Sequence, residues 1–246
     1  MKKIQILDRP LQSLLTIIFA GVLFTGCALA PPEKTIDTVP MYGQPEIPRL
    51  DLLKKADEDF VREAVAGLGS REKASHVWWL QGEKFVNKGD LDYGMRRYNQ
   101  AWLLSPNSYR PYWGFARIRI EQGLYDDSIR YCERAKQLID DDYEKVALLT
   151  DCGSMYSAKA NSLSVADTAG KSSFFSLANE QFKQAIAMDA TYGNAYHRWA
   201  ISLFRQEQYA RAWEMVKEAR SHNASPFPEV FLRRLQEKAP EPKGGG

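Results

Sequence analysis

The chain has 246 residues, enough for one domain or two small ones, and its composition, 44% hydrophobic and 26% charged, is typical of a globular protein. Its formal net charge of +2 comes from the first 26 residues, because residues 27–246 carry equal numbers of basic and acidic side chains. Non-specific nucleic-acid binding needs a basic excess, so we expect no nucleic acid among the partners and no electrostatic docking to anionic lipid.

Residues 1–26 have the features of a signal peptide. Lys2, Lys3 and Arg9 are basic and precede a mostly apolar stretch, residues 11–24, that is too short to span a bilayer comfortably. The stretch ends in the sequence Leu23-Phe24-Thr25-Gly26-Cys27.

This ending resembles the lipobox of bacterial lipoproteins, in which an apolar residue, two small residues and a cysteine mark lipidation and cleavage. The family prefers leucine three places before the cysteine, where this chain has Phe24, with Leu23 one place earlier. The resemblance implies cleavage after residue 26 and a diacylglycerol and N-acyl lipid on Cys27, which give stable anchoring. Because Ala28 follows, it also implies the outer membrane, facing the periplasm. The alternative is an uncleaved helix with a buried thiol.

Residues 27–49 contain five prolines and little apolar sequence. This composition predicts an extended tether between the lipidated cysteine and a folded domain. The alternative is a segment that packs along the domain surface through Met41 and Tyr42.

Residues 50–238 are predicted to form one helical domain. Apolar residues spaced at i, i+3, i+4 and i+7 predict a helix over residues 51–67. Gly67 and Gly69 are expected to end this helix, and Ser70 is a plausible N-cap for the next.

From residue 75 a pattern of aromatic and small residues recurs at intervals of 34. In its first copy the pattern consists of Trp78, Gly82, Phe85, Gly89, Gly94, Tyr98, Ala101 and Pro106. It resembles the tetratricopeptide repeat family, with repeats near 75–108, 109–142, 146–190 and 193–224. The third repeat has surplus residues around 161–173, which either lengthen both helices or form a loop. Residues 229–238 suit a capping helix, and residues 239–246 a disordered tail.

The resemblance implies an all-α fold: a right-handed superhelical solenoid of antiparallel helix pairs, whose concave face is lined by the first helix of each pair. Candidate partner-binding residues on these first helices are Trp79, Glu83, Arg110, Trp113, Arg117, His197 and Arg205. Indoles are good anchors for a peptide or helix, and arginines bind carboxylates. Alternatively, the tryptophans pack against helix 51–67 and the arginines are solvated surface charges.

Cys132 and Cys152 fall at core positions of adjacent helices. A disulfide is possible in an oxidising compartment, but two small reduced core side chains is the interpretation we favour. The three histidines lack ligand spacing, and Gly170-Lys171-Ser172 lacks the rest of a phosphate-binding loop. We therefore expect no metal and no cofactor besides the lipid.

Together these features predict a membrane-anchored periplasmic scaffold or adaptor that binds a protein or peptide and is not an enzyme. A narrower version resembles the pilotin lipoproteins that escort secretion or pilus components. The sequence also allows a purely structural anchor, or an enzyme subunit with its chemistry in residues 161–173. That stretch offers only Lys171 and Asp167 as titratable groups.

Overall fold

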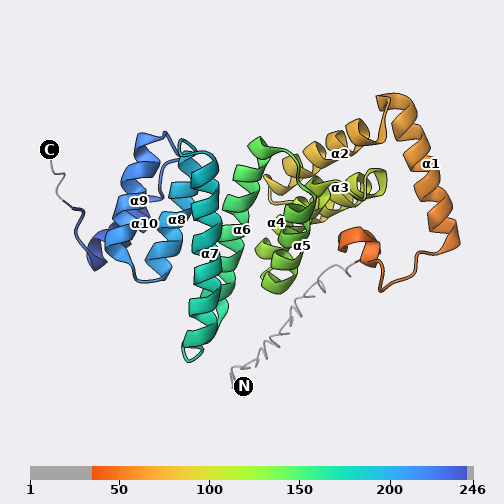
Figure 1. Cartoon of the computed structure of the whole chain (residues 1–246). Helices are drawn as coiled ribbons and strands as arrows, with labels where there is room; N and C mark the ends of the chain where they lie inside the picture. Colours follow the sequence, from red (N-terminus) through yellow and green to blue (C-terminus); the bar gives the residue numbers. More distant parts are fainter. Residues whose placement is uncertain (1–34, 243–246) are drawn as a thin grey trace, which may run out of the picture. The chain divides into compact units, whose positions relative to one another are not determined.

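The computed structural model describes residues 35–242, and Figure 1 shows that this part of the chain is all-α, as predicted. Cys27, the expected signal peptide and residues 243–246 lie outside it. Two short 3-10 helices, η1 (Ile36–Thr38) and η2 (Pro40–Gly43), come first. The α-helices are α1 (Asp51–Leu68), α2 (Arg71–Val86), α3 (Leu91–Leu104), α4 (Tyr109–Glu121), α5 (Tyr125–Leu138), α6 (Asp142–Ser162), α7 (Thr168–Met188), α8 (Gly193–Arg205), α9 (Tyr209–Ser221) and α10 (Glu229–Lys238).

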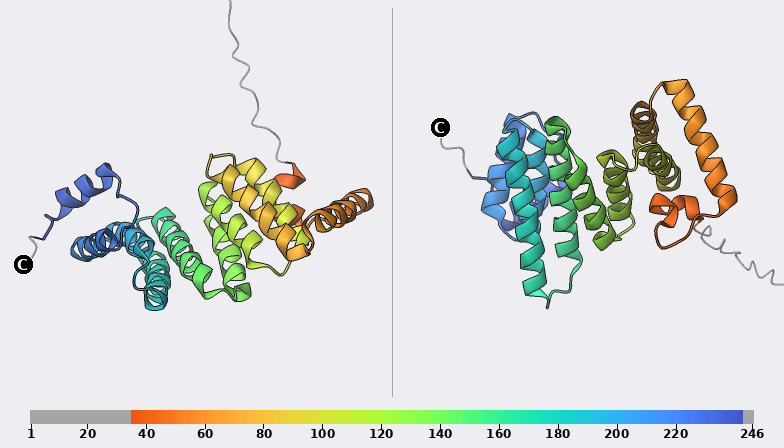
Figure 2. Two further views of the ribbon diagram at one scale, coloured as in Figure 1. Left: turned by 90° about the horizontal axis from the view of Figure 1, so that it is seen from above. Right: turned by 45° about the vertical axis from the view of Figure 1, so that its right-hand side comes forward.

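Helices α2 to α9 form four adjacent pairs: α2 with α3, α4 with α5, α6 with α7, and α8 with α9. The first helix of each pair also contacts the first helix of the next, so that α2, α4, α6 and α8 form one continuous layer. Figure 2 shows the pairs following one another along the array. The array is therefore solenoid-like, with α1 at one end and α10 at the other.

Small residues let the first three pairs approach closely. Tyr98 in α3 is fully buried, and a Cβ atom added at Gly114 in α4 would lie 2.7 Å from its ring. In the third pair, a Cβ at Gly153 would lie 2.9 Å from the buried ring of Phe182. Each glycine therefore makes room for an aromatic side chain of a neighbouring helix.

The surplus residues of the third pair lengthen both of its helices. Helices α6 and α7 each have 21 residues, whereas α8 and α9 have 13 each. Asp167 caps α7 by accepting a hydrogen bond from the backbone N–H of Gly170 at 2.9 Å. The long helices therefore extend one end of this pair beyond its neighbour.

Residues 35–49, here called the strap, correct the prediction of an extended tether. The strap packs against α3, where the fully buried Asn99 donates hydrogen bonds to the carbonyl oxygens of Asp37 at 2.9 Å and Val39 at 2.8 Å. Arg96, also in α3, pairs with the carboxylate of Asp37 at 2.8 Å. Hydrogen bonding to the strap's backbone, which composition does not reveal, holds it on the domain.

The helix predicted over residues 51–67 is present as α1. None of its residues is fully buried, and Arg49 of the strap binds Asp57 of α1 with two hydrogen bonds of 2.7 Å. After α10, the carbonyl of Ala239 accepts a hydrogen bond from the indole of Trp213 at 2.9 Å. Residues 239–242 thus contact α9 and are not a free tail. None of the helices in residues 35–242 combines the length and apolarity needed to cross a membrane.

Candidate binding groove

The layer of first helices contains a small cavity of about 130 Å³, here called the groove. Its lining comes from α2, α4, α6 and α8 and consists of Val86, Arg117, Ile120, Glu121, Asp151, Ser154, Met155 and Arg198. Apolar side chains and ionised groups therefore share one surface to which all four helix pairs contribute.

Ion pairs join successive first helices beside the groove. Arg117 of α4 pairs with Glu83 of α2 and also donates to the side-chain oxygen of Asn87 at 3.3 Å. Arg110 of α4 pairs with Glu144 of α6 at 2.5 Å. Both ion pairs connect residues 34 positions apart, which is the repeat interval. Equivalent positions of neighbouring pairs therefore contact each other directly.

Burial and ion pairing have opposite effects on the pKa of Arg117. Burial alone would lower the pKa of its guanidinium, but the negative charges of Glu83 and Asp151 outweigh this effect and raise the pKa. The side chain is 29% exposed. Arg117 therefore stays charged and remains accessible at one edge to a second carboxylate or carbonyl.

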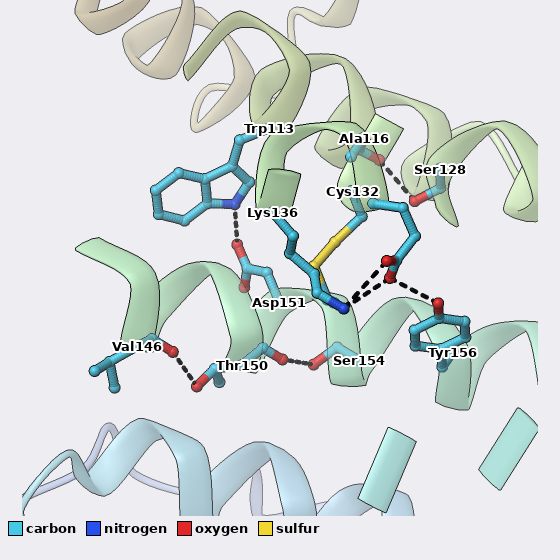
Figure 3. Close-up of a disulfide and its surroundings, with 12 residues drawn as sticks. Trp113, Ala116, Ser128, Cys132, Lys136, Val146, Thr150, Asp151, Ser154 and Tyr156 are labelled. Carbon is cyan, nitrogen blue, oxygen red and sulfur yellow. Dashed lines mark hydrogen bonds and ion pairs between the residues drawn. A yellow bond between two sulfur atoms is a disulfide. The ribbon is translucent and has the colours of Figure 1, made fainter. Parts of the chain in front are cut away.

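Trp113 is not the exposed anchor that the sequence predicts. It is only 9% exposed, and its indole N–H donates to the carboxylate of Asp151 at 2.9 Å (Figure 3). Its ring centroid lies 6.1 Å from that of Trp79, which also stacks on His76 at 5.7 Å. The repeat interval places the two indoles side by side, so that each buries apolar surface of the other. Trp79 remains half-buried.

His197 of α8, another expected groove residue, is also displaced. The ring of His197 stacks on Phe227 at a centroid distance of 4.1 Å, in the segment before α10. Its neighbour Arg198 lies on the groove instead, 3.6 Å from Asp151. The groove-facing position of α8 therefore lies one residue later than predicted, at Arg198 in place of His197.

Asp151 is the groove residue that sequence reasoning missed. It bonds to Trp113 and lies close to Arg198, and so connects α6 with the first helices on both sides. A signal was present, because Asp151 follows Arg117 by the same 34 residues that separate Arg117 from Glu83. The surplus residues, near 161–173, come after Asp151 and leave this spacing unchanged.

Arg205 lies away from these residues, in a second cleft of about 470 Å³ beside the elongated ends of α6 and α7. Lys171 also lines this cleft, and Glu207 is the only carboxylate in its lining. Arg205 makes one long hydrogen bond, 3.5 Å to the hydroxyl of Ser157, and burial lowers its pKa. Asp167, which caps α7, is not among the residues that line this cleft.

Cys132 of α5 and Cys152 of α6 form a disulfide, which corrects the interpretation of two reduced thiols (Figure 3). Their Cα atoms are 5.9 Å apart, a usual separation for a disulfide, and both residues are fully buried. The bond joins the second helix pair to the third, next to Asp151. Within residues 35–242, histidine, cysteine and acidic side chains form no cluster that could hold a metal ion.

No model of a known protein family matches the sequence, and no curated protein is detectably similar to it.

Proposed function

We propose that this chain is a lipid-anchored scaffold of the bacterial envelope that binds a segment of a partner protein in the groove. The lipid would be attached at Cys27, and the helix pairs would be tetratricopeptide-type repeats. The observation that carries the proposal is the meeting of α2, α4, α6 and α8 at a single cavity.

The size and chemistry of the groove favour a polypeptide ligand. Its volume of about 130 Å³ is below the roughly 300–1,000 Å³ of small-molecule sites and suits one inserted side chain. Val86, Ile120 and Met155 supply apolar surface, Arg117 and Arg198 supply positive charges, and Glu121 and Asp151 supply negative ones. An apolar residue flanked by charged groups of both signs would complement this surface.

The groove is already organised for binding. Arg117 and Asp151 are held by partners on neighbouring helices, so their side chains have little rotamer freedom left to lose. The half-buried Trp79 continues the apolar surface toward the beginning of α2. We therefore expect a partner to bind without rearrangement of the helix layer.

In-cell photo-crosslinking tests the proposal. A photo-reactive residue replaces Glu121, which is exposed and lines the groove, or Arg134, which is exposed on α5 outside it. We expect one defined protein to crosslink from position 121 and not from position 134. Equal capture at the two positions, or none at 121, would contradict the proposal.

A substitution that fills the groove provides a second test. Ser154→Trp places a large side chain in the cavity, whereas Ser154→Ala removes only a hydroxyl that donates to the backbone carbonyl of Thr150. We expect Ser154→Trp to abolish crosslinking from position 121 and Ser154→Ala to preserve it. Circular dichroism would establish that both variants are folded.

A further inference from the structure

The packed strap leaves a short connection between Cys27 and the helical array. Residues 28–34 are the only ones between the cysteine and the first described residue, Thr35. A chain of this length, fully extended, spans at most about 29 Å at 3.3–3.6 Å per residue. If Cys27 carries lipid, the strap is held within that distance of the membrane.

Exposed apolar side chains gather close to the start of the described chain. The side chains of Ile36 and Ile47 both approach Gly43, so Ile47 lies beside the start of the described chain. Ile47 is 47% exposed, and the leucines that follow it are more exposed still, Leu50 at 69% and Leu52 at 80%. We call Ile47, Leu50 and Leu52 the apolar edge.

No other element covers the apolar edge within residues 35–242. In Figure 1 the segment from η2 to the start of α1 runs along the border of the array. The face that α1 turns toward α2 and α3 carries other residues, such as Phe60, whose ring lies 5.8 Å from that of Trp78. Leu50 and Leu52 therefore do not pack in the core, and core packing does not explain why these positions are apolar.

The charges around the apolar edge are balanced. Arg49 pairs with Asp57 at 2.7 Å, and Lys54 pairs with Asp51 at 2.8 Å. This arrangement leaves no basic excess to attract anionic lipid headgroups. Any contact with a membrane would depend on burial of apolar surface.

We propose that the apolar edge inserts into the surface of the same bilayer that holds the lipid on Cys27. This inference rests on the lipid anchor of the proposed function. The short connection keeps Leu50 and Leu52 at high effective concentration near the bilayer, so that a few apolar side chains suffice. The strap and the start of α1 then face the membrane, and the array is held in one orientation on it.

Site-specific fluorescence on the full-length, lipidated protein tests this orientation. Leu52→Cys and Tyr143→Cys introduce one reactive thiol each at positions of similar exposure, 80% and 88%. Cys132 and Cys152 are bonded to each other, and a lipidated Cys27 is unreactive. Each variant is labelled with a polarity-sensitive fluorophore and reconstituted into phosphatidylcholine vesicles that contain nitroxide-labelled lipid.

We expect the label at position 52 to shift to shorter wavelength and to be quenched by the nitroxide lipid, and the label at position 143 to behave as in water. Adding Leu50→Ser to the Leu52→Cys variant should reduce the quenching. If the protein floats with the vesicles but both labels remain aqueous, the apolar edge does not touch lipid and the inference is wrong. If wild type and Cys27→Ala both fail to float, the lipid anchor itself is refuted, and this orientation with it.

Discussion

Breaking the disulfide between Cys132 and Cys152 should lower the free energy of unfolding by about 3 kcal/mol. The two cysteines are 20 residues apart in sequence. Closing a loop of this length removes about 11 cal/mol/K of chain entropy from the unfolded state, or about 3 kcal/mol at 25 °C. Both side chains are fully buried, so replacing them with alanine leaves no unpaired polar group.

Urea unfolding of the oxidised protein, the reduced protein and the Cys132→Ala/Cys152→Ala variant provides the measurement. Reduction and the double substitution should lower the midpoint by similar amounts, and a reductant should not affect the double variant. A reduced protein within about 1 kcal/mol of the oxidised one would refute the loop-entropy reasoning for this bond. Because disulfides form in oxidising compartments, protein expressed in such a compartment should contain no free thiol at either position.

Four further substitutions test the packing and the effect of pH. Gly114→Ala should destabilise the protein by about 1–2 kcal/mol in urea unfolding, because overpacking against Tyr98 exceeds the gain in helix propensity. Gly67→Ala in α1 should instead stabilise the protein by about 0.5–1 kcal/mol, because the added Cβ meets no neighbouring atom. Asn99→Leu should speed hydrogen exchange across the strap, since two hydrogen bonds worth about 1–3 kcal/mol together are lost. Burial lowers the pKa of His197 from 6.5, so its neutral form stabilises the fold fully above that pH, and the free energy of unfolding should fall as the pH drops toward the folded-state pKa. His197→Gln should flatten this pH dependence. An unchanged pH profile in the variant would contradict the assignment to His197.

The helices and their pairing follow from local sequence patterns. Three features predict them: the helical spacing of apolar residues, the capping residues, and the small residues where helices lie close together. Each depends on only a few neighbouring positions. Ser70, for example, caps α2 as predicted, accepting a hydrogen bond from the N–H of Lys73 at 3.2 Å. Such features can be read from the chain because the interactions that create them are short in sequence.

The strap and the groove depend on contacts that composition does not encode. The strap's prolines indicate an extended tether, yet Asn99, about sixty residues later, supplies the hydrogen bonds that fix it. Trp113 has the chemistry of a binding residue, but Asp151, which lines the groove, occupies its only donor. Predicting these contacts requires the distances between helices of different repeats as well as the sequence pattern within one repeat.

The same contacts constrain how the groove works. Glu83–Arg117 joins the first pair to the second, the disulfide and Trp113–Asp151 join the second to the third, and Asp151–Arg198 reaches the fourth. Each link fixes the spacing of two adjacent helix pairs. A partner segment therefore meets a surface whose dimensions are set before binding, and the entropy cost of ordering falls mainly on the partner. If this is correct, reducing the disulfide should weaken partner capture from position 121 even under conditions in which the helices remain folded.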